Sequence, residues 1–552
     1  MRKKRIMFCT EATFLNTGYA TYTREILNYL NSTGKYELAE LAAYGKVNDE
    51  RAIGIPWKFY GVMPADNASK EEHQVYSSHP SFQFGENRFE DACLNFKPDV
   101  VCDIRDFWMV DFIERSPFRP FFNWCLMPTV DARPQARQWI ATYKSADACL
   151  SYSDWSGGVL KNQSGGKINY LGSAPPSAHP AYQPIQNKEE LKKSLKLDPN
   201  CKIIGTVMRN QRRKLYPDLF AAFKSFLGQV SNPEQYFLYC HTSYPDMGWD
   251  IPELLQTHQL SSKVYFTYVC ADTKRHFASL FKGAMAQSPF TQKLNAVLPS
   301  VRLGLEYEQL AEIINSFDLY AQYANSEGFG LPQVEAAACG VPVCGTDYSA
   351  MESILRQLEG YPIKPKALYK ELETGCLRAV PDNEEAVKVF LEFFKKPESI
   401  RRKIGFNTRQ KFKEIFQWEK SGKVWESYFD SVEMRPHSET WDSPPRFRKP
   451  HKKPSAKELQ QIPFQQLSRW LIQNVLCDNT KVNSYLEDRM GRDLMYGSCT
   501  SSTGGIYENE ASVAFEGNNT RREFNFDIAY NNMFQLCNKH NFWEQKRMEK
   551  LQ

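Results

Sequence analysis

Short apolar segments alternate with helix-like segments along most of this 552-residue chain. A buried parallel strand is predicted at residues 4–10, KRIMFCT, because a continuous apolar run between polar residues is typical of a strand covered on both faces. A helix follows, in which Ile26, Leu27 and Leu30 share one face, and a second strand is predicted at 37–45. Strand, helix and strand in this order begin a parallel α/β sheet.

The alternation continues through the first half of the chain and then restarts. Three further strands are predicted in the first half, each with polar residues at its carboxyl end: 98–106, 121–131 and 148–154. After a Pro-rich crossover, strands are predicted at 202–208, 236–243, 263–269 and 317–324. The carboxyl ends of parallel strands face the ligand crevice of an open sheet, so we expect two Rossmann-like domains that face a cleft.

Charge and cysteine content narrow the class of protein. The formal net charge is +5, and residues 434–458, with seven Lys/Arg and three Asp/Glu, contribute +4 of it. This basic, Pro-rich segment reads as a solvated linker, with weak contact to phosphate or a membrane surface as the alternative. Fourteen cysteines occur without a Cys-x-x-Cys pair, which favours reduced, buried thiols in a cytoplasmic protein. No apolar run approaches the roughly 20 residues that span a bilayer, so no transmembrane segment is expected.

The stretch NSEGFGLPQVEAAACGVPVCGTDYSA, from Asn325 to Ala350, carries most of the chemistry. It follows the last of these strands and passes through a Gly-Phe-Gly turn into a helix of small residues. Gly328 and Gly330 let backbone N–H groups approach a ligand, and the start of a helix favours an anion. Glu327 and Glu335 can then face one crevice. One carboxylate would bind sugar hydroxyls and the other a ribose, with a diphosphate between them over the glycines.

The string EGFGLPQVEAAACGVPV within this stretch resembles the glutamate–seven–glutamate signature of family 4 of the glycosyltransferases, the retaining enzymes of the GT-B fold. The resemblance covers nearly every position from Ser326 to Val343. It implies a GT-B fold in which the second domain binds most of a nucleotide-sugar donor. The donor-binding residues that it implies in this stretch are Glu327, Gly328, Phe329, Gly330, Leu331 and Glu335.

The family also has an arginine after the first strand of its second domain and a lysine five residues on, both of which hold the donor diphosphate. Arg209 and Lys214 stand at that place and spacing, and are the expected catalytic cations. The leaving group is a nucleotide diphosphate, so stabilising its developing charge is a main task of the catalyst. Arg212 and Arg213, which lie between the two, are expected to be solvated loop residues.

The first domain matches the family more loosely. NTGYATYT resembles the Gly-rich loop after the first strand, although many relatives have two glycines there. Gly18 takes the position of close approach, and Thr17 and Gly18 would face donor phosphate or acceptor. Many relatives also have a histidine near the reacting sugar, and FFNWCLMPTVDARP has none. Asp131 is the expected acceptor-side catalytic group, with Thr129 and Asp106 as further candidates at strand ends.

A segment at 268–294 interrupts the second domain. Cys270-x-x-Thr273 and Ser288-x-x-Thr291 have the spacing of two zinc knuckles with three thiols missing, whereas zinc needs four ligands. We therefore expect no metal here, and a helical insertion rather than a degenerate ribbon. The Asp-x-Asp motif that holds a metal in glycosyltransferases of the other major fold does not occur. No metal or cofactor is expected beyond the donor, for which a UDP- or GDP-sugar is favoured.

The domain plan that the resemblance implies has five parts. An acceptor domain occupies 1–180, a donor domain 181–415, and a helix over 416–433 crosses back to the first domain. The basic linker over 434–458 follows. Residues 459–552 form a mostly helical extension with no assignable motif.

The reaction implied is metal-independent transfer of a sugar, with retention of anomeric configuration, to a hydroxyl of a saccharide or lipid-linked saccharide. Two alternatives stay open. One is a phage-type DNA glycosyltransferase that modifies a hydroxylated base, with residues 434–458 tracking phosphate and the base flipped out of the duplex. The other is a non-catalytic scaffold that binds sugar nucleotides.

Overall fold

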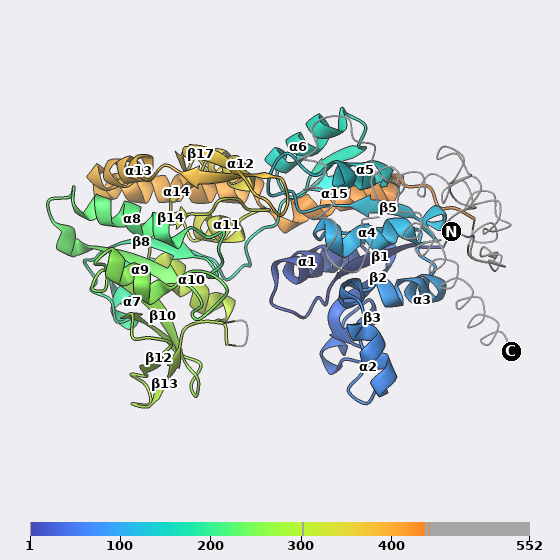
Figure 1. Cartoon of the computed structure of the whole chain (residues 1–552), viewed down its shortest axis with the longest axis horizontal. Helices are drawn as coiled ribbons and strands as arrows, with labels where there is room; N and C mark the ends of the chain where they lie inside the picture. The colour runs from blue at the N-terminus through green and yellow to red at the C-terminus, as the bar shows by residue number, and fades with distance from the viewer. Residues whose placement is uncertain (1, 117, 301–302, 437–440, 442–552) are drawn as a thin grey trace, which may run out of the picture.

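The computed structural model describes residues 2–116, 118–300, 303–436 and 441. Two α/β units lie side by side, and each is built on its own sheet (Figure 1). The basic linker, apart from residues 434–436 and 441, and the whole predicted extension over 459–552 lie outside the described residues.

The first unit contains a seven-stranded parallel sheet in the order β3-β2-β1-β4-β5-β6-β7. Its strands are β1 (Lys4–Glu11), β2 (Tyr36–Lys46), β3 (Lys58–Met63), β4 (Val100–Asp103), β5 (Asn123–Leu126), β6 (Ala148–Ser151) and β7 (Tyr170–Ser173). Its helices are α1 (Gly18–Thr33), α2 (Lys70–Ser77), α3 (Glu86–Phe96), α4 (Phe107–Arg115), α5 (Arg137–Ser145) and α6 (Asp154–Ser164), with the short 3₁₀ turns η1 (Glu50–Ala52), η2 (Pro80–Phe84) and η3 (Arg119–Phe121). The strands predicted in the first half of the chain are confirmed. β1 is buried from Ile6 onward, as its continuous apolar run requires.

The second unit contains a nine-stranded sheet in the order β12-β13-β10-β9-β8-β14-β15-β16, with β11 paired to β10. Its strands are β8 (Lys202–Val207), β9 (Tyr236–His241), β10 (Val264–Cys270), β11 (His276–Leu280), β12 (Met285–Gln287), β13 (Leu294–Val297), β14 (Leu319–Gln322), β15 (Val343–Thr346) and β16 (Tyr361–Ile363). A separate antiparallel hairpin pairs β17 (Pro365–Lys370) with β18 (Leu377–Pro381). The helices are α7 (Lys188–Ser194), α8 (Tyr216–Leu227), α9 (Ile251–Thr257), α10 (Tyr307–Asn315), α11 (Leu331–Ala338), α12 (Ala350–Gln357), α13 (Asn383–Lys395) and α14 (Glu398–Ile415), with the 3₁₀ turn η4 (Pro233–Gln235). The helix α15 (Trp418–Ser431) follows α14.

The helical insertion predicted at 268–294 is wrong. The structure places three strands there, and β11 and β13 both pair antiparallel with β10. Phe277, Leu280 and Phe281 have helical spacing in the sequence, but the open edge of β10 offers a complete ladder of backbone hydrogen bonds. Pairing with that edge therefore outweighs the local helical pattern.

The last described helix, α15, returns to the first unit and lies against α1 (Figure 1). The fully buried Trp425 donates an indole hydrogen bond to the hydroxyl of Tyr22 (2.9 Å), and the hydroxyl of Tyr29 donates to Glu426 (2.6 Å). The chain thus crosses between the two units a second time, which ties them together.

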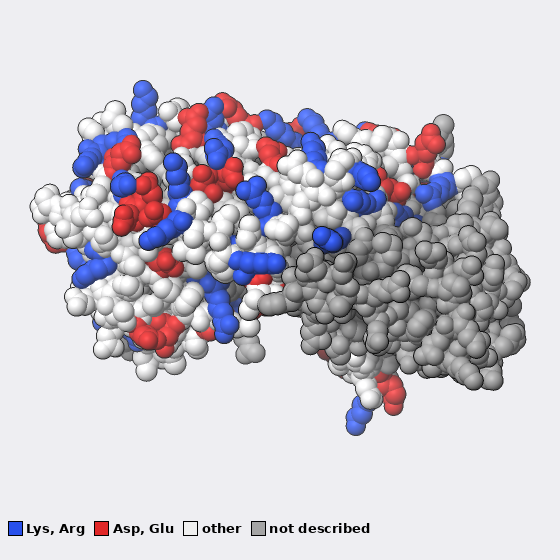
Figure 2. Space-filling view, turned by 45° about the horizontal axis from the view of Figure 1, so that its top comes forward, with Lys and Arg blue, Asp and Glu red and all other residues white. Residues whose placement is uncertain are grey.

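The burial of the cysteine thiols and the mixed charges on the surface are typical of a globular protein. Eleven of the fourteen cysteines lie within the described residues, and each is free and buried. Figure 2 shows Lys/Arg and Asp/Glu side chains interspersed over the face of the second unit that it presents, without a patch of one sign. Among the described residues, no helix has the length and apolar character needed to cross a membrane.

Candidate active site

The loops at the carboxyl ends of β5 and β14 meet between the two units. The Ser326 hydroxyl, on the loop after β14, lies 3.3 Å from Asp131 Oδ2 on the loop after β5. A Cβ added to Gly328 would lie only 2.5 Å from the Thr129 methyl group. Glycine at this position therefore lets the first unit pack against the Gly-Phe-Gly turn, a role that the sequence does not reveal.

The turn itself leads into α11 as the sequence predicts. Gly330 has a φ of +97°, which strongly favours glycine, and Pro332 lies in the first helical turn. Phe329 packs its ring against Phe416, 6.1 Å between centroids, whereas Leu331 lines the cavity described below. The backbone around Gly330 thus marks the start of a helix that faces the space between the units.

Glu327 is 5% exposed and has polar partners on several sides. Its carboxylate accepts hydrogen bonds from Gln322 Nε2 (2.7 Å) and Arg213 Nη1 (2.6 Å), and it also contacts the ammonium group of Lys214. Its backbone N–H donates to the Ser349 hydroxyl (2.9 Å). A buried carboxylate needs such partners, and two cations here provide them.

Arg213 is a correction to the sequence analysis, which assigned it to a solvated loop. The backbone of residues 213–215 pairs with that of 323–325: Asn325 N–H donates to Arg213 O (2.9 Å), and Leu215 N–H donates to Tyr323 O (3.0 Å). This pairing carries both Arg213 and Lys214 to Glu327. The Arg213 side chain is still 43% exposed.

Arg209 lies in the predicted loop after β8 but does not contact Glu327. Its guanidinium group forms two hydrogen bonds with Asp246, of 2.8 and 2.9 Å, and 47% of its side chain is exposed. The arginine lowers the pKa of Asp246 to about 2. Of the two cations that the sequence singled out, the structure brings only Lys214 to the glutamate, and the role of Arg209 stays a prediction.

A cavity of about 230 Å³ joins Glu335 to the first unit. Thr17 and Gly18 at the start of α1 line it on one side, and Leu331 and Glu335 of α11 line it on the other. Thr17 caps α1 by accepting a hydrogen bond from the backbone N–H of residue 20 (3.2 Å). The starts of two helices therefore border one cavity and favour an anion at the helix ends, although Glu25 and Glu306 also line it.

Glu335 and Gly18, on opposite sides of this cavity, differ in burial and in the space around them. Glu335 is buried, and burial raises its pKa to about 7, while the Tyr182 hydroxyl acts in the opposite direction. A Cβ on Gly18 would meet no atom within 4 Å, so the protein alone does not require glycine there. The open space beside Gly18 leaves room for a ligand close to the backbone.

The first unit contributes two carboxyl groups beside these residues. Asp131 accepts a 2.6 Å hydrogen bond from Arg378, a residue that the sequence analysis missed. Burial and the neighbouring Asp131 raise the pKa of Asp106 to about 7, opposed by the hydroxyls of Tyr19 and Thr129. These two hydroxyls are 2.8 Å apart. Asp131 and Asp106 thus both reach the cleft, but Asp131 is already ion-paired.

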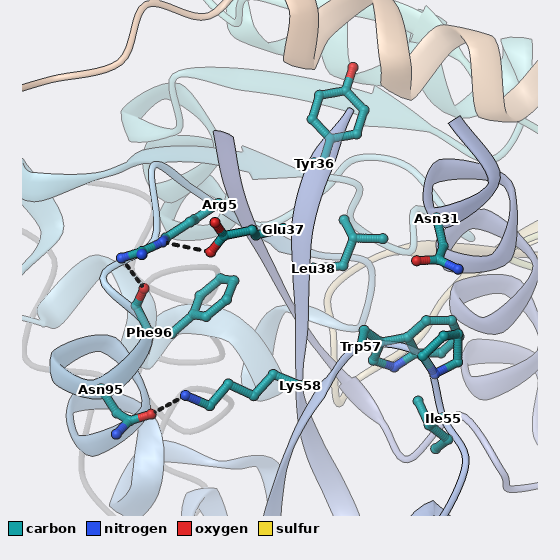
Figure 3. Close-up of a pocket in the computed structure, with 11 residues that line it drawn as sticks. Arg5, Asn31, Tyr36, Glu37, Leu38, Ile55, Trp57, Lys58, Asn95 and Phe96 are labelled. Atoms are coloured by element: carbon teal, nitrogen blue, oxygen red, sulfur yellow. Dashed lines mark hydrogen bonds and ion pairs between the residues drawn. The ribbon is translucent and has the colours of Figure 1, made fainter. Parts of the chain in front are cut away.

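A larger hollow of about 540 Å³ lies elsewhere (Figure 3). It is lined by Arg5, Glu37 and Lys58 at the amino ends of β1, β2 and β3, together with Trp57. Arg5 pairs with Glu37 on the adjacent strand (2.9 Å). Ligands of open parallel sheets bind at the carboxyl ends of strands, so we assign the donor to the smaller cavity between the units.

Comparison with known proteins agrees with this geometry. Residues 300–411, which include Glu327, Glu335 and Arg378, match the model of the family "Glycosyl transferases group 1". The MMP α-(1→4)-mannosyltransferase of Mycolicibacterium hassiacum is 28% identical over 116 residues, which is 21% of this chain and 25% of that protein. The match thus spans about a quarter of the curated relative.

Similarity to solved structures identifies the fold of most of the chain. The sucrose-phosphate synthase of Thermosynechococcus elongatus superimposes with a TM-score of 0.56 at 15% identity, over 78% of this chain and 100% of that one. HepE of Anabaena, solved in complex with UDP and glucose, gives a TM-score of 0.54 at 12% identity over the same shares. At such identities the likeness concerns the fold alone. The fold is GT-B, as the signature around Glu327 predicted.

Proposed function

We propose that this chain transfers a sugar from a nucleoside-diphosphate donor to an acceptor hydroxyl. The observation that carries the proposal is the cavity between the units, where the start of α1 faces Glu335 on α11. The family match of residues 300–411 supports a sugar as the group transferred. A UDP- or GDP-sugar donor is consistent with the UDP and glucose bound by the HepE protein of the same fold.

We orient the donor by the groups that line this cavity. Glu335 would accept hydrogen bonds from the ribose hydroxyls, because its buried carboxyl group lines the cavity beside the Tyr182 hydroxyl. The diphosphate would lie between the starts of α1 and α11, close to Gly18 and Gly330, where backbone N–H groups favour phosphate. The sugar would then extend toward Glu327, whose carboxylate can accept from its hydroxyls.

The cations beside Glu327 suit the chemical step. As the bond between the anomeric carbon and the diphosphate oxygen breaks, negative charge grows on the diphosphate, and Arg213 and Lys214 can stabilise it. Arg209 can join them if it leaves Asp246. In a retaining front-face reaction the acceptor oxygen forms its bond to the anomeric carbon on the face that the diphosphate leaves. The acceptor proton passes to a diphosphate oxygen, so no enzyme nucleophile is required.

The acceptor would enter from the first unit. Asp106, with a pKa of about 7, and the exposed part of Asp131 are the carboxyl groups that can hold an acceptor hydroxyl there. A saccharide or lipid-linked saccharide presents such hydroxyls. Residues 434–458, predicted to be a solvated linker with contact to DNA or membrane phosphate as the alternative, lie almost entirely outside the described residues.

Thermal denaturation with a panel of UDP-glucose, GDP-mannose and ADP-glucose tests the donor. A ligand at 100 times its Kd stabilises the folded protein by about 2.7 kcal/mol, so a true donor raises the melting temperature. The Glu335→Gln variant should lose most of this rise, whereas Glu398→Gln on the exposed face of α14 should keep it. If no member of the panel raises the melting temperature of the natural protein, the proposed function is wrong.

The anomeric outcome needs a second measurement on the donor that the panel identifies. The NMR coupling constant of the anomeric proton in the product reports its configuration directly. Retention is expected, and an inverted product would reject the front-face step while leaving donor binding intact.

A further inference from the structure

The β17–β18 hairpin connects the loop of Glu327 to the loop of Asp131. Three consecutive residues of β18 make the connection. The backbone N–H of Leu377 donates to Arg133 O of the first unit (2.9 Å), and the backbone N–H of Ala379 donates to Asn325 O (3.0 Å). Arg378 lies between them. The strand therefore has one backbone contact on each side of the cleft.

The Arg378 side chain likewise contacts both sides of the cleft. Nη1 donates to Asp131 Oδ2 (2.6 Å) and to the Ser326 hydroxyl (2.6 Å), while Nη2 donates to Glu371 Oε2 (2.8 Å) within the hairpin. Only 9% of the side chain is exposed. Glu371 is itself held by the Thr374 hydroxyl (2.6 Å). The two carboxylates raise the pKa of Arg378 against the effect of its burial, so the guanidinium group is always charged.

Two of the three groups that Arg378 contacts, Ser326 and Asp131, adjoin the proposed donor and acceptor sites. Ser326 is the neighbour of Glu327 in sequence. Asp131 lies two residues after Thr129, whose methyl group packs against Gly328. A planar guanidinium group bonded at fixed angles to both sides allows little variation in their separation. Small errors in such a separation matter, because a misplacement of about 1 Å can cost about 10²-fold in rate.

We propose that Arg378 is the positioning residue of the cleft, holding the loop of Glu327 and the loop of Asp131 at the separation at which donor and acceptor meet. Arg378 does so without touching either substrate. The catalytic consequence of this inference rests on the proposed function, whereas its structural consequence does not depend on that function. Removal of the guanidinium group should let the two units move apart.

Distances between the units provide a test that needs no ligand. Double electron–electron resonance would be recorded between spin labels at cysteines introduced for Lys70 and Lys388, both exposed and on different units. Cys477, Cys499 and Cys537, outside the described residues, would be replaced by serine, and the described cysteines are buried. The natural protein should give one narrow distance distribution.

Three variants separate the possible outcomes. Arg378→Ala and Asp131→Asn should both add a population at longer distance. Glu371→Gln, which loses only the contact inside the hairpin, should keep the natural distribution. If Arg378→Ala fails to fold, Asp131→Asn decides. Natural distributions in both Arg378→Ala and Asp131→Asn would overturn the proposal, even where UDP still raises the melting temperature.

Kinetics distinguish positioning from donor contact. With UDP-glucose as the probe, hydrolysis by the Arg378→Ala variant should show kcat lowered by about 10²-fold and an unchanged donor KM. A raised KM with unchanged kcat would mean that Arg378 binds the donor, and would reject the positioning role. Absence of hydrolysis by the natural protein would count against the proposed function, and the distance measurement would still stand.

Discussion

Glu335→Gln should stabilise the ligand-free protein, and the gain should depend on pH. Burial raises the pKa of Glu335 from 4.5 to about 7, which corresponds to about 3 kcal/mol of folding free energy when the group is ionised. The isosteric amide carries no charge and fills the same space. The glutamate is thus a stability cost at neutral pH, of the kind expected for a group retained to bind a ligand.

The sign follows from the order of the two pKa values. Below about pH 4.5 the carboxyl group is protonated in both states, so the natural protein has no deficit. As the pH rises toward 7 the unfolded state is ionised first, and the advantage of the glutamine variant grows by about 1.4 kcal/mol per pH unit. Above about pH 8 the folded group is ionised too, and the advantage stays constant. Asp106 and Glu40, whose pKa values are also raised to about 7, are present in both proteins and cancel.

Differential scanning calorimetry at pH 5 and pH 8 measures the effect. One kcal/mol shifts the melting temperature of a unit of 150–250 residues by about 2–4 °C, so a gain of roughly 6–12 °C is expected at pH 8 and a much smaller one at pH 5. Glu398→Gln on α14, whose side chain is 63% exposed, serves as the control and should show no such change. An equal gain for Glu335→Gln at both pH values would refute the reasoning.

Three further predictions concern the cleft and the crossing helix. Lys214→Ala should lower turnover by about 10²–10³-fold with the fold retained, as judged by near-UV circular dichroism, because it removes one cation from the leaving group. Gly328→Ala should cost about 1–3 kcal/mol by overpacking against Thr129, and Thr129→Ser, which removes the contacted methyl group, should restore the melting temperature. Trp425→Ala should lower stability to urea by about 3–5 kcal/mol, since it empties a fully buried site and leaves the Tyr22 hydroxyl without its donor; a loss below about 1 kcal/mol would mean that α15 does not hold the units together.

Local patterns in the sequence predict much of the fold. Strands such as β1 and β8 have continuous apolar runs because both faces of a parallel strand are covered, and such runs are visible without any tertiary information. The glutamates at 327 and 335 are equally visible, because their spacing is set by one turn and one helix. The segment at 268–294 misleads because its apolar spacing suits a helix, while its structure depends on the edge of β10.

The residues that the sequence analysis missed are those placed by pairing between distant segments. Arg213 reaches Glu327 only because residues 213–215 pair with 323–325. Arg378 reaches Asp131 only because β18 pairs with the loop at Arg133 of the other unit. Neither pairing has a local pattern in the sequence. Arg209, by contrast, stands at the expected spacing, and its contact with Asp246 cannot be read from that spacing.

Isothermal titration of UDP into the natural protein and into Lys214→Ala tests the central claim most directly. A diphosphate between the starts of α1 and α11, beside Arg213 and Lys214, predicts one site in the natural protein. A charge-assisted hydrogen bond contributes about 1.5–3 kcal/mol, so the variant should bind UDP roughly 10- to 100-fold more weakly. Failure of UDP, GDP and ADP all to bind the natural protein, or equal affinity in the variant, would contradict the account.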